Sequence, residues 1–184
     1  RNKINIQLII EGCKRGNRNS QRILFEQYAG YGMSICLRYA KNREEAEEIL
    51  NNGFLKTLNK IEQYDTQYPF QVWLRKIMIN TAVDYHRANK NQLTFLELQP
   101  NNSKTVETPM PVLSPGEDVL PILQQLSPAY RMVFNLSVME GYKHDEIAEM
   151  LGISAGASRS NLARAKEKLR AIVQKKDYKK VAIE

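Results

Sequence analysis

The stretch over residues 145–154 decides the fold: it reads Asp-Glu-Ile-Ala-Glu-Met-Leu-Gly-Ile-Ser. It predicts a helix that ends at Leu151, followed by a glycine, Gly152, that accepts a left-handed turn. An apolar plug, Ile153, and a capping serine, Ser154, then lead into a second helix. This order is typical of a helix-turn-helix.

The second helix is predicted over residues 155–173 and has two distinct sides. Its apolar stripe recurs at steps of three and four residues, at Leu162, Ala165, Leu169 and Ile172. A polar, cationic side carries Arg159, Ser160, Arg164 and Lys168, with Asn161 and Lys166 beside them. A helix of this kind could enter a DNA major groove. The alternative is an ordinary helical hairpin with a solvated face.

The rest of the chain also predicts helices, with a break in the middle. Five of the seven prolines lie between residues 100 and 121, and residues 90–117 are predicted as a flexible linker. Signals for strands are nearly absent. We therefore predict an all-α fold with two small helical domains, at residues 1–89 and 118–175, and a basic tail at 176–184. The helices are predicted over residues 20–40, 44–61, 70–87, 121–126, 128–139, 145–151 and 155–173.

The charge distribution favours a polyanionic partner. The 184 residues carry a net charge of +7. Residues 1–90 and 151–184 each carry +6, whereas residues 91–150 carry −5. Two basic segments can release counterions from phosphates at two places while the acidic middle stays away. The alternative is a pair of solvated basic faces.

The composition argues against several classes of protein. The longest stretch without charge, residues 119–130, is too short to span a membrane, and residues 4–10 do not form an export signal. We therefore expect a cytoplasmic protein without membrane insertion. Two cysteines, Cys13 and Cys36, and two histidines are too few for a metal cluster, so we expect no metal and no cofactor. Both cysteines are predicted to be buried thiols. No set of catalytic residues is present, and we expect no enzyme activity.

The N-terminal half contains two informative strings. Residues 45–56 read Glu-Ala-Glu-Glu-Ile-Leu-Asn-Asn-Gly-Phe-Leu-Lys, and their acidic start also suits a helix dipole. Residues 70–80 read Phe-Gln-Val-Trp-Leu-Arg-Lys-Ile-Met-Ile-Asn and are followed by Asp-Tyr-His-Arg at 84–87. In this helix one face carries Lys76, Asn80, Asp84 and Arg87.

These strings resemble region 2 of bacterial RNA polymerase sigma factors. The helix-turn-helix, preceded by Leu-Ser-Pro-Ala-Tyr-Arg at 126–131, resembles their region 4. Region 2 followed directly by region 4 in a short chain is the arrangement of the extracytoplasmic-function (ECF) group of the sigma-70 family. The chain resembles this group over residues 18–173. Some positions depart from the family pattern. The family often has Asp at the position of Glu48, Gln at that of Asn51 and a carboxylate at that of Asn52. Ser158 replaces a usual apolar residue, and Lys143 stands where a capping Ser or Thr is common.

The resemblance implies an initiation factor that binds core RNA polymerase, recognises promoters and melts the −10 element. Contacts with the clamp coiled coil of the largest subunit would involve Glu47, Glu48, Asn51, Asn52 and Phe54. Contacts with the −10 element would involve Tyr64, Trp73, Arg75, Lys76, Asn80, Asp84 and Arg87. Contacts with the −35 duplex would involve Ser154, Arg159, Ser160, Asn161, Arg164 and Lys168.

Two points stay open at this stage. Trp73 shares an apolar stripe with Phe70 and Ile77, so it is equally well interpreted as a core residue. A conventional helix-turn-helix regulator with an N-terminal dimerisation or signal domain is the alternative function.

The resemblance further implies the polymerase flap region and an anti-sigma factor as partners.

Overall fold

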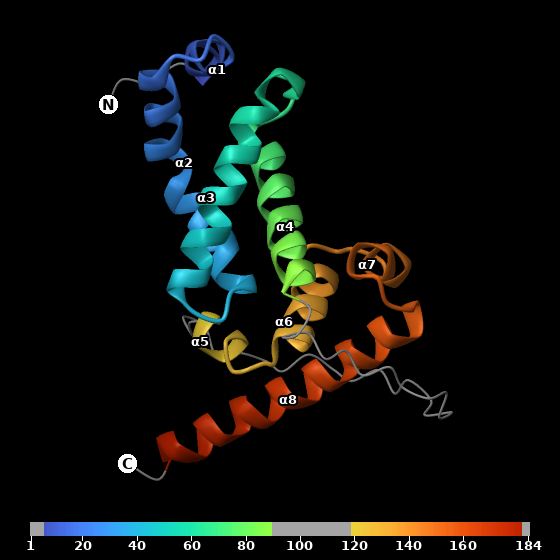
Figure 1. The fold of residues 1–184 in the computed structure, drawn as a ribbon. Helices are drawn as coiled ribbons and strands as arrows, with labels where there is room; N and C mark the ends of the chain where they lie inside the picture. Colours follow the sequence, from blue (N-terminus) through green and yellow to red (C-terminus); the bar gives the residue numbers. More distant parts are fainter. Residues whose placement is uncertain (1–5, 90–118, 182–184) are drawn as a thin grey trace. The chain divides into compact units, whose positions relative to one another are not determined.

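The computed structural model describes residues 6–89 and 119–181, with side chains as far as Lys175 (Figure 1). The predicted linker at 90–117 lies outside the described residues, as do residues 182–184 of the predicted tail. Every regular element in the described ranges is helical, which confirms the all-α class. The chain divides into two compact units, one ending at Tyr85 and the other beginning at His86.

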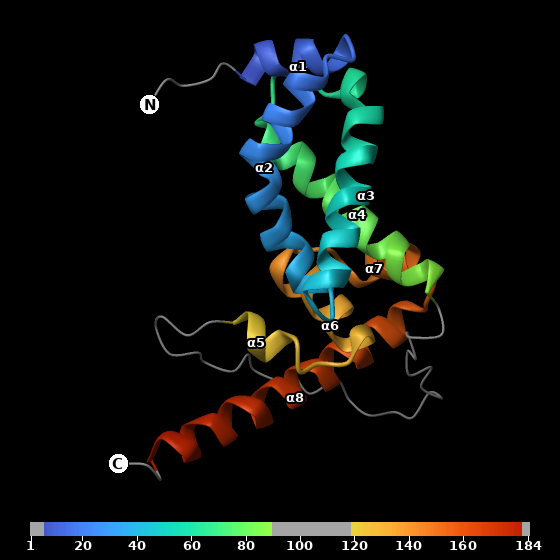
Figure 2. The same cartoon turned by 60° about the vertical axis from the view of Figure 1, so that its left-hand side comes forward.

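The first unit is built on three long helices that lie side by side, with a short helix across the start of the first of them (Figures 1 and 2). The short helix, α1, was not predicted; it buries Ile9, Ile10 and Cys13 on one side. The elements are α1 (Ile6–Lys14), α2 (Arg18–Tyr39), α3 (Arg43–Asn59), the 3-10 turn η1 (Ile61–Gln63) and α4 (Phe70–Ala88).

Asparagine caps set where α2 and α3 begin. The Asn17 side chain accepts a hydrogen bond from the Ser20 amide at 3.0 Å, so α2 begins two residues before its predicted start. Asn42 accepts from the Glu45 amide at 2.9 Å and begins α3 in the same way. Such caps satisfy amides that have no partner within the helix.

The core of this unit requires a close approach of α3 to α4. A Cβ atom at Gly53 would come within 2.4 Å of the Met78 sulfur, so the glycine is what allows Met78 to lie against α3. Aromatic rings fill the space beside it: Phe25 contacts Phe54, and Tyr28 contacts Phe70, each with ring centroids 4.8 Å apart.

The second unit packs three short helices against one long helix. Its hydrophobic core joins Ile122, Leu123 and Leu126 to Phe134 and to residues of the long helix, namely Ala165, Leu169 and Val173. The elements are α5 (Leu120–Leu123), α6 (Pro128–Phe134), the π-helical turn η3 (Asn135–Met139), α7 (His144–Leu151) and α8 (Ala155–Val181).

Two helices of this unit differ from their predicted lengths. The helix predicted over 128–139 changes at Asn135 into a π turn, where the Glu140 amide donates to the Asn135 carbonyl at 3.0 Å. Helix α8 continues to Val181 instead of ending near Val173. Residues 174–181 contain neither glycine nor proline, so nothing in that stretch ends the helix.

Candidate nucleic-acid and polymerase interfaces

The solvent-facing side of α3 is polar around one apolar residue. Glu47, Glu48, Asn51 and Asn52 are all exposed. Leu55 lies one turn beyond Asn51 and Asn52 and is 60% exposed. This α3 face therefore offers two carboxylates, two amides and an aliphatic side chain to a partner.

Phe54, which the resemblance placed among the polymerase contacts, is not on this face. Its side chain is only 5% exposed and its ring packs on Phe25. Phe54 points toward α2, since its ring packs on Phe25 and also lies near Gly32 of that helix. The structure therefore exposes Leu55 rather than Phe54, and the polymerase contact of Phe54 stays a prediction.

Helix α4 presents a second exposed face. Lys76, Asn80, Asp84 and Arg87 are exposed and follow one another at steps of three or four residues, as predicted. Arg75 is separated from this α4 face: it lies five residues before Asn80, about 140° around the helix, and is half-buried. The prediction that grouped Arg75 with the other −10 residues is not supported by the geometry.

Two side-chain bonds join α3 to α4. Lys56 Nζ lies 2.7 Å from Asp84 Oδ2, and the Tyr85 hydroxyl donates to Glu48 Oε2 at 3.1 Å. Burial raises the pKa of Tyr85, and the hydrogen bond to Glu48 raises it further. A residue of the α3 face and a residue of the α4 face are thus each tied to the neighbouring helix. Sequence reasoning identified neither bond.

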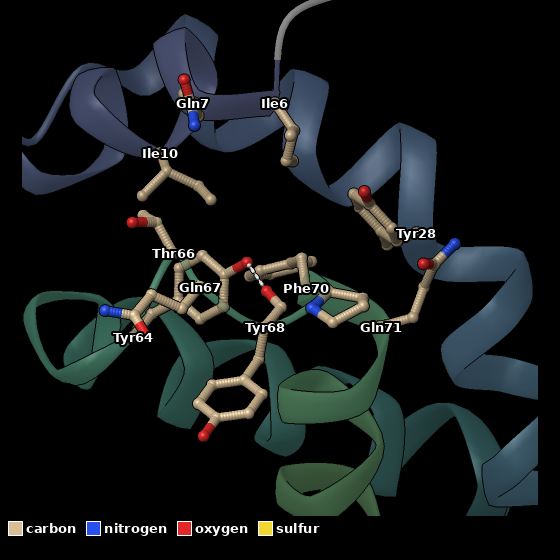
Figure 3. A pocket seen from close by; sticks show the side chains of 11 residues that line it. Ile6, Gln7, Ile10, Tyr28, Tyr64, Thr66, Gln67, Tyr68, Phe70 and Gln71 are labelled. Carbon is tan, nitrogen blue, oxygen red and sulfur yellow. Dashed lines mark hydrogen bonds between the residues drawn. The ribbon is translucent and has the colours of Figure 1, made fainter.

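A pocket of about 320 Å³ opens at the start of α4 (Figure 3). The loop before α4 forms one wall, where the Tyr64 hydroxyl donates to the Tyr68 carbonyl and the Gln67 amide donates to Asp65 Oδ1 at 2.9 Å. The opposite wall comes from α1 and α2, through Ile6, Gln7, Ile10 and Tyr28. The pocket is therefore mostly aromatic and aliphatic, with amide groups at its rim.

Trp73 lies beside this pocket and is half-buried. Its ring packs against Tyr64 and Phe70, with centroids 5.2 and 5.7 Å away. Tyr64 itself is buried, and burial raises its pKa. The Trp73 ring thus belongs to the aromatic cluster, while its contact with the −10 element stays a prediction.

The predicted helix-turn-helix is present. Gly152 ends α7 with φ of 66°, and the Ser154 hydroxyl accepts from the Ala157 amide at 3.0 Å to begin α8. Lys143 does not cap α7 with its side chain; instead its backbone amide donates to Glu146 Oε2 at 2.7 Å. The cap that the family usually takes from Ser or Thr is therefore replaced in part by Glu146.

Ser158 also has a clear structural place. It is buried between α7 and α8, and its hydroxyl shares a hydrogen bond of 2.9 Å with His144 Nδ1. Burial lowers the pKa of His144, and the positive charge of Arg159 lowers it further. The departure from the family pattern at Ser158 thus replaces an apolar contact with a polar link between the two helices.

The −35 residues predicted on α8 occupy different sides of the helix. Ser160 and Arg164 lie one turn apart, with Arg164 exposed and Ser160 half-exposed. Arg159 and Lys168 are also exposed. They are nine residues apart, so their side chains point to roughly opposite sides of the helix axis. Together they form a central pair, Ser160 and Arg164, with one cation on each flank.

Asn161 does not belong to this exposed face. Its side chain is fully buried, and Nδ2 donates to the Ala157 carbonyl at 2.8 Å. The structure therefore gives Asn161 a place inside the unit, and its contact with DNA stays a prediction. Ser154 is exposed, but its hydroxyl is already used as the helix cap.

The described residues contain little else that resembles a chemical site. Over residues 6–89 and 119–175, no group of three His, Cys, Asp or Glu side chains could hold a metal ion. Both cysteines are buried, as predicted, and burial raises the pKa of Cys36 to about 12. Among the described helices, none is both long enough and apolar enough to cross a bilayer.

Two family models match the chain in the order that the sequence predicted. Sigma-70 region 2 matches residues 24–92, and sigma-70 region 4 matches residues 117–169, so that together they cover about two thirds of the chain. The chain belongs to the sigma-70 family. A regulator with an unrelated N-terminal dimerisation or signal domain is not favoured, because the N-terminal half of this sigma factor is itself a sigma region.

Whole-length relatives place this sigma factor in the ECF group. It is 28% identical to the RNA polymerase sigma factor CarQ of Myxococcus xanthus over 172 residues, which cover 89% of this chain and 95% of the relative. It is 24% identical to the ECF RNA polymerase sigma-E factor of Haemophilus influenzae over 180 residues, which cover 91% and 95%. This ECF sigma factor therefore directs promoter recognition in transcription initiation.

One solved structure is also similar, that of the sigma factor RpoE in complex with the anti-sigma factor NepR from Bartonella quintana. The match covers 83% of this chain and 96% of that chain, at 15% identity and a TM-score of 0.49. A similarity of this size does not establish a common arrangement of the parts.

Proposed function

We propose that the α3 face is the surface that docks on core RNA polymerase. Its residues would be Glu47, Glu48, Asn51 and Asn52, with Leu55 in the place that the resemblance gave to Phe54. The clamp coiled coil of the largest subunit is the proposed partner. Support comes from the exposure of Leu55 at the end of a polar surface, because interfaces combine exposed apolar side chains with neighbouring polar groups.

We propose that the α4 face and the adjoining pocket recognise the −10 element. Lys76 and Arg87 would hold backbone phosphates, and Asn80 would meet a base edge. The pocket of about 320 Å³ is large enough for an unstacked base, which aromatic walls can hold by stacking. Among the residues proposed for −10 recognition, Tyr64 and Trp73 are kept as members of the aromatic cluster beside the pocket, and Arg75 is left out.

We propose that α8 reads the −35 element as duplex DNA. Ser160 and Arg164 would face base edges, while Arg159 and Lys168 would contact phosphates on the two flanks of the groove. Ser154 would hold the start of the helix in place. The polymerase flap region is the proposed protein partner of this unit.

The two units would act together through the segment between them, which we propose as a domain linker at residues 90–117. A segment of about 28 residues could span at most roughly 90–100 Å when extended. It could therefore connect DNA sites that are two or more helical turns apart. Tethering makes the second contact intramolecular, so each unit can bind weakly alone. We infer that the free protein binds promoters poorly without the polymerase.

Three further parts of the proposal depend on the family. The chain would have no catalytic chemistry of its own and would act in the cytoplasm, where the transcription machinery works. An anti-sigma factor would mask one of its interfaces until a signal releases it. The solved sigma factor complex mentioned above is a relative's assembly and does not identify this partner.

The observation that carries the proposal is the presence of three exposed polar faces, two of them on α3 and α4, which share one hydrophobic core, and the third on α8, which packs on a second core. Reconstituted run-off transcription with core polymerase and a promoter library is the direct test. Initiation from a defined subset of promoters, dependent on this chain, is the expected result. If core polymerase initiated transcription no more efficiently with the chain than without it, the proposal would be refuted.

A further inference from the structure

A lysine outside the predicted site joins the α4 face from the neighbouring helix. Lys56 lies near the end of α3, 28 residues before Asp84 in the sequence, yet its Nζ is 2.7 Å from Asp84 Oδ2. The side chains of Lys56 and Asp84 are 41% and 57% exposed. Both are therefore open to solvent at the edge where α3 meets the α4 face.

Asp84 is an unusual residue for a surface that meets DNA. The α4 face otherwise carries Lys76, Asn80 and Arg87, all of which can donate hydrogen bonds to phosphate oxygens. A bare carboxylate among them would repel the backbone, since like charges a few ångströms apart interact unfavourably. The contact with Lys56 neutralises Asp84 and brings a third cation to the α4 face.

Lys56 has the chemistry to bind a second oxygen anion. An ammonium group has three N–H donors, and Asp84 Oδ2 takes one of them. Exposed ion pairs contribute little to stability, so the Lys56–Asp84 pair adds little to the free energy of unfolding. A fixed ammonium with donors left over at the edge of a cationic face suits a backbone phosphate.

We propose that Lys56 is a further promoter-contacting residue, which binds a backbone phosphate of the −10 segment while Asp84 holds its ammonium group in place. Asp84 is then a positioning residue rather than a reader of bases. This inference rests on the proposed role of the α4 face in −10 recognition.

Salt dependence of DNA binding tests the proposal, because each phosphate contact releases counterions. Holoenzyme is assembled from core polymerase and each variant, and its affinity for a fork-junction promoter DNA is measured over a range of salt concentrations. For Lys56→Gln we expect the slope of log K against log salt to become shallower by about 0.7–0.9. Lys56→Arg restores the slope. Asp84→Asn weakens binding to the same extent for every −10 sequence and leaves the base preference unchanged, because Lys56 loses the carboxylate that positions it.

Lys14→Gln is the matched control, since Lys14 is also paired with a carboxylate, Glu11 at 3.2 Å, but lies on α1. It leaves the slope unchanged. Thermal melting of every variant checks that the fold is retained. An unchanged slope for Lys56→Gln, or a new base preference for Asp84→Asn, overturns the proposal. Failure of the wild-type holoenzyme to bind the promoter would instead overturn the proposed function of the α4 face.

Discussion

Replacing each of two neighbouring residues on α3 with alanine separates folding from polymerase binding. Phe54 is 5% exposed and packs on Phe25, so Phe54→Ala removes a buried ring and leaves a cavity. Such a change costs about 3–5 kcal/mol. For a unit of this size, each kcal/mol lowers the melting temperature by about 4–8 °C, which predicts a decrease of roughly 12–40 °C.

Leu55→Ala has the opposite profile. Because Leu55 is 60% exposed, its removal should change the free energy of unfolding by no more than about 0.5 kcal/mol. If Leu55 is the apolar centre of the docking surface, its loss costs about 1 kcal/mol or more of binding energy. That corresponds to roughly a fivefold or larger increase in Kd for core polymerase.

Two measurements on the full chain distinguish these effects: thermal melting followed by circular dichroism, and titration of a fluorescently labelled variant with core polymerase. Leu8→Ala is the control, since Leu8 is 71% exposed on α1, away from the α3 face, and should alter neither quantity. The assignment fails if Leu55→Ala binds polymerase as tightly as the wild type. It also fails if Phe54→Ala melts normally but loses polymerase.

Four other outcomes follow from the structure. Arg164→Ala should weaken −35-dependent transcription in a run-off assay without reducing co-purification with polymerase; equal loss of both would contradict its place on α8. Asn80→Ala should reduce permanganate reactivity of the melted −10 region more than closed-complex binding. The pKa of His144 is lowered on folding, so the folded state favours the neutral imidazole. This contribution to stability is present above pH 6.5 and is lost as the pH falls through the pKa of the folded state. His144→Gln should therefore make the melting temperature depend less on pH in this range. Cys36, whose pKa is raised to about 12, should not react with thiol reagents at pH 8 until the chain unfolds.

Local signals were sufficient for most of the helices. The left-handed glycine at 152 and the serine caps at 127 and 154 each act within a few residues, so the sequence itself contains the interaction. The proline after Ser127 likewise begins α6 where it was predicted. Helix α1 was missed because its apolar residues were weighed only as an export signal, although Ile9, Ile10 and Cys13 have the spacing of a buried helical side.

The differences at single site residues have another origin. Phe54 lies four residues after the buried Leu50 and three before the buried Thr57, so helical periodicity places it inward, whereas the resemblance gave it a surface role. Asn161 likewise lies four residues from the buried Ala157 and Ala165, and its amide bonds within α8. At both positions the role implied by the resemblance conflicts with the buried side of the helix.

The bonds between α3 and α4 connect the two faces of this unit that are proposed to meet different partners. Glu48 bonds to Tyr85 and Lys56 pairs with Asp84, so consecutive residues of α4 are held from two places on α3 about 12 Å apart along its axis. Two separated attachments resist rotation of one helix about the other better than a single one does. A polymerase that grips the α3 face would therefore also fix the direction of the α4 face. Recognition of the −10 element then requires no rearrangement within this unit, and variants that break both bonds should lose −10 recognition before they lose polymerase binding.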